Sequence, residues 1–571
     1  MKTIYQFLVI LFSLYVFNSC TDVLDKKDLT ALDEQTVWND ASYAEFFVNK
    51  LCIDNLPGWD TSDNSDNTPG GGNILYGQIT SNDINDWPYT QIRNVNLFLQ
   101  KIGTGNIDAS TQSVLKGQAL VLRAWLYFRM VRLYGGVPLI LEPQELKDDL
   151  YVTRNKTSEC ITQIVKDLDD AINSDLPWSW SGDNAGKISK AAALALKARV
   201  LLFWASPQYN RPGTRDAQRW ETAYSVNKQA KEQLENQGYG LYNSYSDLWF
   251  DEMNKEVIFV KRQYYPGETN AWAASTRPLE ASTNYTGGNH PTAEFVDIYP
   301  MADGTSPSES PDYDPIHYWR NRDPRFEATI AYNSCYYPLI GRAVTRQWTY
   351  RGYAPEQNNG SRTGYYCRKA IDMTQTVFDC QNSPTDWIEI RYAEVLLNFA
   401  ECAAETGHND EAVEVLKQIR ARAGILPGEN RMYGIKTGLT GDDLINAIMF
   451  ERRIELAFEG NKRYWDLRRR RLFAPELNGT RRHGRFANLV EPLTPVDMDQ
   501  IRLSTPEPDW DTEYTKYFED ELVLIDTQYD INYPDSYYFY GIPNSHLEAN
   551  SKLQQTEGWP DNGSGLFDPY Q

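Results

Sequence analysis

The sequence predicts a mainly α-helical protein with long irregular loops and a few short strands. Apolar residues recur at helical spacing along many segments, as in helices that bury one face. Residues 190–236 and 387–423 each contain two such stretches joined by a short polar turn, which indicates helical hairpins. From about residue 239 to 385 the periodicity is lost, and Gly, Pro, Asn, Tyr and Trp become frequent. We therefore expect a helical scaffold that carries a long loop-rich segment.

The N-terminal part should contain several helices, one of which begins near Tyr89. Residues 33–52 have a broad apolar face, and a loop rich in Gly and Pro follows at 57–88. A strong helical pattern over 110–133 stops at Gly135-Gly136-Val137-Pro138. Glycine commonly ends a helix and proline cannot continue one, so this stop is well defined. The next amphipathic helix is expected over residues 157–172.

The two hairpins differ in how clearly the sequence marks them. Lys190–Ala205 is rich in alanine and apolar nearly all round, so it should be buried, with Trp220–Asn236 as its partner. Trp387–Thr406 is expected to form a helix that ends at Gly407. A short polar turn then opens an antiparallel helix that runs to Ala423, and this arrangement resembles a tetratricopeptide hairpin.

The last expected helix, Leu444–Arg471, is long and heavily charged. Its final run, Arg468–Arg471, is interpreted as a solvated helix end and not as a binding patch. Short strands such as Val257–Arg262 fit the loop-rich segment between the hairpins.

The N-terminus has the layout of a secretory signal. Lys2 precedes an apolar stretch, Ile4–Phe17, that ends at Asn18-Ser19-Cys20. A bilayer-spanning helix needs about 20 apolar residues, so this stretch is too short to serve as one. We expect residues 1–19 to be a signal peptide and Cys20 to be lipidated. The alternative is a cleaved signal followed by an incidental cysteine.

The composition argues against nucleic acid and against metal chemistry. Fifty-six Lys and Arg against 78 Asp and Glu give a net charge of −22, which opposes binding to phosphate backbones. The cysteines beyond Cys20 lack CxxC spacing and the five histidines are scattered, so we expect no metal site and no cofactor. The sequence does not decide whether one or two disulfides form. The large aromatic content, 13%, favours a protein that stacks flat ligands.

Sequence motifs of common enzymes are absent. The chain contains no GxSxG, HExxH or Walker sequence, and no GxGxxG that opens a helix. A pair of catalytic carboxylates could still lie among the many acidic residues, as in a glycosidase. We expect a binding protein and not an enzyme, with a surface glycosidase as the less favoured alternative.

Five blocks of sequence resemble the SusD/RagB family and occur in the family's order. The blocks are residues 122–139, 188–199, 291–325, 451–468 and 542–559. The most specific is Glu451-Arg452-Arg453-Ile454-Glu455-Leu456-Ala457-Phe458-Glu459-Gly460, which continues into Arg463-Tyr464-Trp465-Asp466. Residues in these motifs are expected to be structural, with Arg452–Tyr464 forming buried ion pairs. The resemblance covers essentially the whole mature chain.

The resemblance implies a single SusD-like domain over residues 20–571, with parts at 20–240, 241–385 and 386–571. About four tetratricopeptide-like pairs would carry the loops as a ligand face. It also implies a lipid-anchored, surface-exposed lipoprotein of the outer membrane. Such a protein binds oligo- or polysaccharide without catalysis and delivers it to a SusC-like TonB-dependent transporter. Capture of peptides by a RagB-like relative is the alternative.

The variable loops should supply the ligand residues, since the shared motifs build the scaffold. A sugar site needs an aromatic platform together with polar groups that pair with hydroxyls. The candidates are Trp59, Asp60, Asp86, Trp87 and Tyr89 in one loop, Trp272, Arg277 and Tyr285 in a second, and Trp319 in a third. We expect the loops at 57–89 and 268–290 to form one shallow surface, with Trp87 and Trp272 as the leading platforms. For Trp87 and Trp319, packing in the core is the alternative.

Overall fold

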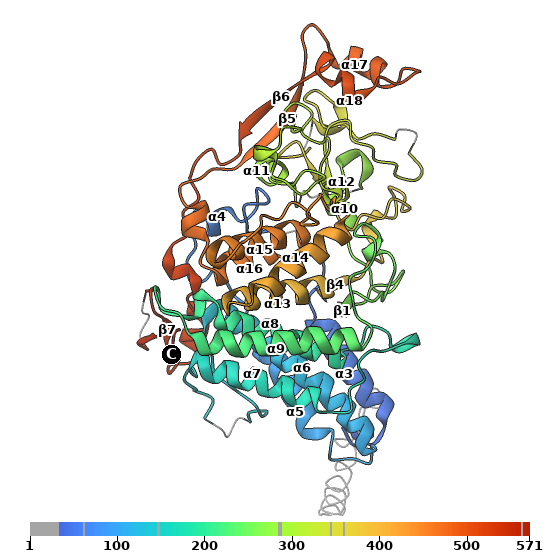
Figure 1. Cartoon of the computed structure of the whole chain (residues 1–571). Coiled ribbons are helices and arrows are strands. Elements are labelled where there is room, and N and C mark those ends of the chain that lie inside the picture. The colour runs from blue at the N-terminus through green and yellow to red at the C-terminus, as the bar shows by residue number, and fades with distance from the viewer. Residues whose placement is uncertain are drawn as a thin grey trace, which may run out of the picture.

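The computed structural model describes residues 34–571 apart from 61–62, 146–148, 284–287, 343–344, 358–359 and 561–563. The expected signal peptide, Cys20 and Tyr285 lie outside the described residues. The lower half of the molecule in Figure 1 is a stack of helices, and the upper half is built mainly from loops and short elements. In chain order, the helices of the stack are α2 (Glu34–Asn39), α3 (Ala41–Asn55), α5 (Tyr89–Lys101), α6 (Ala109–Tyr134), α7 (Thr157–Ile172), α8 (Lys190–Ala205), α9 (Ala217–Asn236), α13 (Tyr392–Glu405), α14 (Asn409–Ala423), α15 (Gly441–Glu455) and α16 (Lys462–Arg469).

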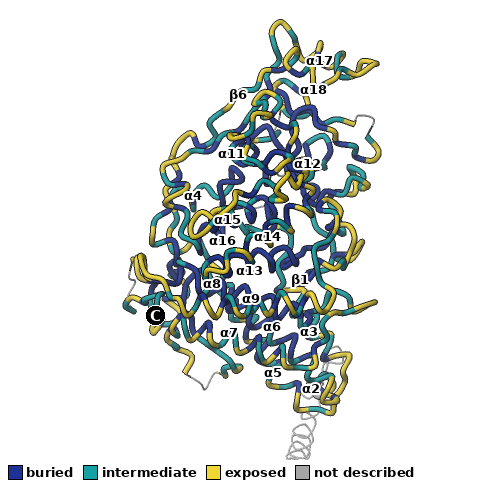
Figure 2. The backbone as a smooth tube through the Cα atoms, in the orientation of Figure 1, coloured by how far each residue is buried: buried dark blue, intermediate teal, exposed yellow. Residues whose placement is uncertain are grey.

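The expected helical hairpins are present. Helix α6 packs against α7, α8 against α9, and α13 against α14. The all-round apolar surface of α8 is buried because α7, α9 and α13 all contact it. Figure 2 shows the result, with buried backbone inside the stack and exposed residues along its rim. The prediction of a mainly helical, tetratricopeptide-like scaffold is confirmed.

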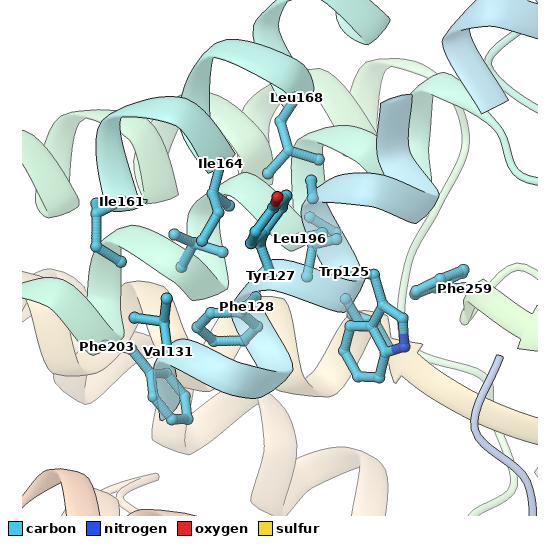
Figure 3. Close-up of a cluster of buried hydrophobic side chains, with 14 of the residues drawn as sticks. Trp125, Tyr127, Phe128, Val131, Ile161, Ile164, Leu168, Leu196, Phe203 and Phe259 are labelled. Carbon is cyan, nitrogen blue, oxygen red and sulfur yellow. The ribbon is translucent and has the colours of Figure 1, made fainter. Parts of the chain in front are cut away.

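The core of the helical stack forms where aromatic side chains of α6 meet neighbouring elements (Figure 3). The ring of Phe128 meets that of Phe203 on α8 with centroids 5.3 Å apart. The ring of Trp125 lies edge-on to Phe259 of strand β1 (Val257–Lys261) at 6.0 Å. These contacts connect the helical stack to the first strand of the loop-rich half.

The loop-rich half has a hydrophobic core of its own, drawn from residues between 248 and 518. The strands of the described residues pair two by two, with β7 and β8 beside the helical stack near the C-terminus (Figure 1). Strand β1 is antiparallel to β4 (Trp387–Arg391), β2 (Ile330–Ala331) to β3 (Tyr366–Cys367), and β5 (His483–Leu489) to β6 (Phe518–Leu524), while β7 (Gln555–Thr556) and β8 (Leu566–Phe567) are parallel. The short helices are α4 (Gly72–Leu75), α10 (Trp272–Thr276), α11 (Ala293–Asp297), α12 (Pro324–Thr329), α17 (Pro495–Arg502), α18 (Trp510–Glu513) and α19 (Asn544–Ala549).

The structure divides two segments that were expected to be single helices. The first breaks at Asp40, whose carboxylate accepts a hydrogen bond from the Ser42 amide at 2.8 Å and caps α3. The second breaks between α15 and α16, where Phe458, Gly460 and Asn461 all have positive φ. Residues 387–391, expected to begin a helix, instead form β4.

The interpretation of Arg468–Arg471 as a solvated helix end is wrong. Arg468 and Arg469 have no exposed surface. Arg469 donates to Glu401 at 2.5 and 2.6 Å, and Arg468 donates to the Tyr464 hydroxyl at 2.8 Å. Glu401 comes from a helix that is distant in sequence, so local charge could not reveal this burial.

A network of buried ion pairs joins the two halves of the molecule. Glu455 of α15 pairs with Arg325 of α12 at 2.8 Å, with Arg391 of β4 at 2.6 Å and with Arg422 of α14. Arg391 also pairs with Glu459 at 2.8 Å. Burial alone would raise the pKa of Glu455, but the three guanidinium groups hold it well below its ordinary value. The expectation that the Arg452–Tyr464 block is structural and ion-paired is confirmed.

Two further findings concern the described part of the chain only. Its six cysteines are all free thiols, so no disulfide forms among them. None of its helices combines the length and the apolar character needed to cross a bilayer.

Candidate functional site

The predicted residues around Trp87 lie against the helical stack and not on an open platform. The Trp87 ring stacks on His546 with centroids 5.1 Å apart and meets Tyr134 edge-on at 5.6 Å. The Tyr89 hydroxyl donates to the Pro138 carbonyl at 2.7 Å. These contacts tie both rings to the scaffold.

Asp86, expected to accept hydrogen bonds from sugar hydroxyls, instead receives the Arg129 guanidinium. Its two carboxylate oxygens accept from that guanidinium at 2.7 and 3.0 Å. A half-buried bidentate pair leaves this carboxylate committed to the scaffold. Trp87 packs against the hydrophobic core of the helical stack, and Trp272 belongs to the core of the loop-rich half. The single surface expected to hold both rings is therefore not formed.

Trp272 is a core residue, which corrects its expected role as an exposed platform. Its side chain is only 1% exposed, and its indole ring stacks on Trp59 at 4.5 Å. Trp249 and Trp387 also pack against Trp59, at 5.4 and 5.0 Å. The loops at 57–89 and 268–290 do meet here, but they meet as the inside of an aromatic cluster.

The remaining predicted residues are also engaged with the protein. Arg277 has no exposed surface and donates to the carbonyls of Asp372 and Thr376 at 2.6 and 3.1 Å. Trp319 is 8% exposed and donates from its indole nitrogen to Asp511 at 2.9 Å, which corrects its assignment as a ligand contact. Asp60 lies on the surface and accepts a long hydrogen bond from Asn461 at 3.4 Å.

A groove in the loop-rich half offers the combination that the predicted residues lack. It has a volume of about 460 Å³, which suits a small molecule or a short segment of an oligomeric ligand. We call it the 368–374 groove. Its lining consists of Ser246, Asp247, Phe250, Pro324, Glu327, Ala328, Arg368, Ala370, Ile371, Asp372, Met373 and Thr374.

The side chains of this groove are suited to a ligand rich in hydroxyls. The Phe250 ring is 40% exposed and supplies an apolar face. Arg368 donates to Glu327 at 2.5 Å and to the backbone carbonyl of Tyr336 at 2.9 Å. Tyr336 is 53% exposed. Asp372 adds a further carboxylate. An aromatic face beside charged hydrogen-bonding groups can stack on a sugar ring while pairing with its hydroxyls.

Two of the predicted residues, Trp272 and Arg277, donate hydrogen bonds from the protein interior to the backbone of the groove wall. The indole nitrogen of Trp272 donates to the Lys369 carbonyl at 3.0 Å, and Arg277 holds the Asp372 carbonyl. Between them Ala370 has φ of +56°, a left-handed conformation that costs a residue with a Cβ about 1–2 kcal/mol. Strained backbone of this kind clusters at functional sites. Trp272 and Arg277 therefore fix the backbone of this wall at Lys369 and Asp372.

Sequence reasoning missed Phe250, Arg368 and Asp372. All three lie in segments without periodicity, so nothing in the pattern separates inward from outward side chains. The one available signal was a run of three large apolar residues between two aspartates, in Asp247-Leu248-Trp249-Phe250-Asp251.

Two family models match this chain. One, described as the SusD family, matches residues 255–559. The other, described as starch-binding and associating with the outer membrane, matches residues 28–202. A SusD-like protein of Formosa agariphila is 25% identical over 472 residues, which cover 78% of this chain and 84% of that relative.

Solved structures agree on the fold. A SusD-like protein from Bacteroides fragilis is 28% identical, with a TM-score of 0.74 over 93% of this chain and 99% of that one. A SusD-like carbohydrate-binding protein from the same species is 24% identical, with a TM-score of 0.72 over 91% of this chain and 100% of that one. The mainly helical scaffold with its loop-rich half is thus shared.

Proposed function

This chain belongs to the SusD family, and on that premise we propose that it captures oligo- or polysaccharide at the cell surface and delivers it to a SusC-like TonB-dependent transporter. The observation that carries the proposal is the 368–374 groove, where Phe250 presents an aromatic face beside Arg368 and Asp372. The description of the second family model, which names starch binding, supports a glycan as the ligand.

The protein is further proposed to act from a lipid anchor on the outer membrane, without catalysis. The apolar N-terminal stretch that ends at Cys20 supports the anchor. Acyl chains on one cysteine suffice for stable attachment when more than one chain is present. The family description names association with the outer membrane and binding, which supports both the location and a role in capture.

A panel experiment tests the proposal as a whole. The mature protein is run in native gels that contain different neutral and charged polysaccharides, and retardation is followed by titration calorimetry. Binding to at least one polysaccharide is expected, with no increase in reducing ends after prolonged incubation. Binding of casein-derived peptides in place of any glycan would favour peptide capture, and release of reducing ends would favour a glycosidase.

Phe250→Ala is expected to weaken binding to the polysaccharide identified in that panel by about 10- to 150-fold. Loss of an aromatic ring that stacks on a nucleic-acid base costs about 1–3 kcal/mol, and a sugar face makes a comparable flat contact with such a ring. The Phe250 ring is part-exposed, so the variant should fold normally. Calorimetry gives the affinity, and thermal unfolding gives the stability.

Phe46→Ala is the matched control for Phe250→Ala. Phe46 is 68% exposed on α3, in the helical half and outside the groove lining. The substitution removes the same kind of ring from the surface and should leave the affinity for the polysaccharide unchanged. Equal affinities for the wild type and Phe250→Ala would show that the ligand binds elsewhere.

Cys20→Ala is expected to release the protein from the membrane fraction. The acyl chains cannot be attached without the thiol, and the remaining chain should then be recovered in soluble fractions. Fractionation is followed by immunoblotting in cells that lack the partner transporter. Cys52→Ala removes a thiol from α3 and serves as the control, which should remain membrane-bound. Retention of Cys20→Ala with the outer membrane would contradict the anchor.

A further inference from the structure

The 368–374 groove carries an excess of negative charge. Three carboxylates, those of Asp247, Glu327 and Asp372, line it together with one guanidinium, that of Arg368. Three negative charges against one positive charge leave −2 within a single small groove. The whole chain carries the same sign, with a net charge of −22.

The single cation of the lining is already committed. Arg368 pairs with Glu327 at 2.5 Å and donates to the Tyr336 carbonyl at 2.9 Å. A guanidinium held in this way neutralises one carboxylate of the groove. It leaves the charges of Asp247 and Asp372 unmatched.

Asp247 and Asp372 are held by neutral donors. Asp247 accepts from the Ser244 hydroxyl at 2.8 Å, and Asp372 accepts from the Thr374 amide and hydroxyl at 2.8 and 2.6 Å. Within the described part of the chain, neither carboxylate has a cationic group within 4.0 Å. Both keep free lone pairs that can accept hydrogen bonds from a ligand.

The two cations behind the groove wall face away from the ligand side. The Lys369 ammonium is buried and donates to Glu459 and to the Glu455 carbonyl. Arg277 is buried as well, and its guanidinium is committed to two backbone carbonyls. Neither provides a donor for an anionic group that enters the groove.

We propose that the groove selects neutral glycans and rejects polysaccharides that carry carboxylate or sulfate groups; this inference rests on the proposed function. A neutral sugar donates its hydroxyl hydrogens to Asp247 and Asp372. The carboxylate of a uronate, or the sulfate of a sulfate ester, places a further anion against them, and that group has no proton to donate. Specificity then comes from a repulsive element in the site as well as an attractive one.

The experiment compares polysaccharides that share a backbone and differ in charge. Laminarin is paired with carboxymethyl laminarin, hydroxyethyl cellulose with carboxymethyl cellulose, and dextran with dextran sulfate. For any pair whose neutral member binds, we expect the anionic member to bind at least about tenfold more weakly at low salt. The discrimination should shrink as ionic strength rises, because salt screens the repulsion.

A double variant, Asp247→Asn with Asp372→Asn, removes the unmatched charges while keeping side-chain size. It should bring the two members of a pair to within about threefold of each other. Glu429→Gln with Glu548→Gln is the control, since it removes two charges from exposed positions outside the groove lining. This control should keep the discrimination of the wild type.

Each outcome decides a different claim. Equal or tighter binding of the anionic member by the wild type overturns charge selection while the proposed glycan capture stands. Unchanged discrimination in the Asp247→Asn, Asp372→Asn variant overturns the assignment to these two residues. Failure of every polysaccharide to bind would remove the proposed function, and this inference with it.

Discussion

Replacing Glu455 with Gln is expected to lower the free energy of unfolding by about 3–5 kcal/mol at pH 7.5. The substitution keeps the size of the side chain and removes its charge. Arg325, Arg391 and Arg422 would then remain buried with one counter-charge fewer. Uncompensated buried charge is costly because the interior cannot replace the lost solvation. Urea denaturation followed by tryptophan fluorescence measures the change.

The same substitution should cost less in acid. The pKa of Glu455 lies well below its ordinary value, and that of Glu459 lies at about 2 because Arg391 and Lys369 outweigh the effect of burial. A lowered pKa contributes stability above the ordinary value near 4.5, and this contribution is lost as the pH falls toward the lowered value. The gap between wild type and Glu455→Gln should therefore narrow by about 1.4 kcal/mol for each pH unit below about 4.5.

Glu521→Gln is the control for this measurement. Glu521 pairs with Arg351 at 2.7 Å, but both side chains are about half exposed. Surface pairs of this kind contribute about 0–1 kcal/mol, so the control should be nearly neutral. If Glu455→Gln changed the free energy of unfolding as little as this control, the ion-pair network would not be what joins the helical and loop-rich halves.

Helices of this protein could be predicted where one face alone decides burial. The bounds expected for residues 157–172 are those of α7, since its apolar stripe repeats without interruption. The break before α16 could not be predicted, because it depends on a tertiary contact. A Cβ on Gly460 would lie 2.7 Å from the Trp387 ring, and Trp387 is distant in sequence. Periodicity describes one helix at a time and contains no such information.

The candidate site was harder to predict than the fold for a related reason. The loop-rich half has its own hydrophobic core, and large aromatic residues serve both that core and the surface. Trp272 and Phe250 both lie in aperiodic segments of the sequence, yet the first is 1% exposed and the second 40%. Without a regular period, composition identifies the segments that build a groove but not the side chains that face it.

Trp272→Ala is the second substitution expected to have a large effect, and the effect should be on stability first. Removing a buried indole costs about 3–5 kcal/mol through lost transfer energy and the cavity that remains. The ring is almost fully buried against Trp59, so little relaxation is available. The Lys369 carbonyl would also lose its donor, which should loosen the groove wall at Ala370.

Trp272→Phe separates these two contributions. It keeps most of the ring and removes the indole N–H, so stability should recover in large part while affinity for the bound polysaccharide stays reduced. Phe250→Ala should show the opposite pattern, with weak binding and normal stability. Thermal unfolding and calorimetry on the three variants measure both quantities. A Trp272→Ala protein that is fully stable and binds weakly would instead place Trp272 in contact with the ligand, and would contradict the positioning role that its burial supports.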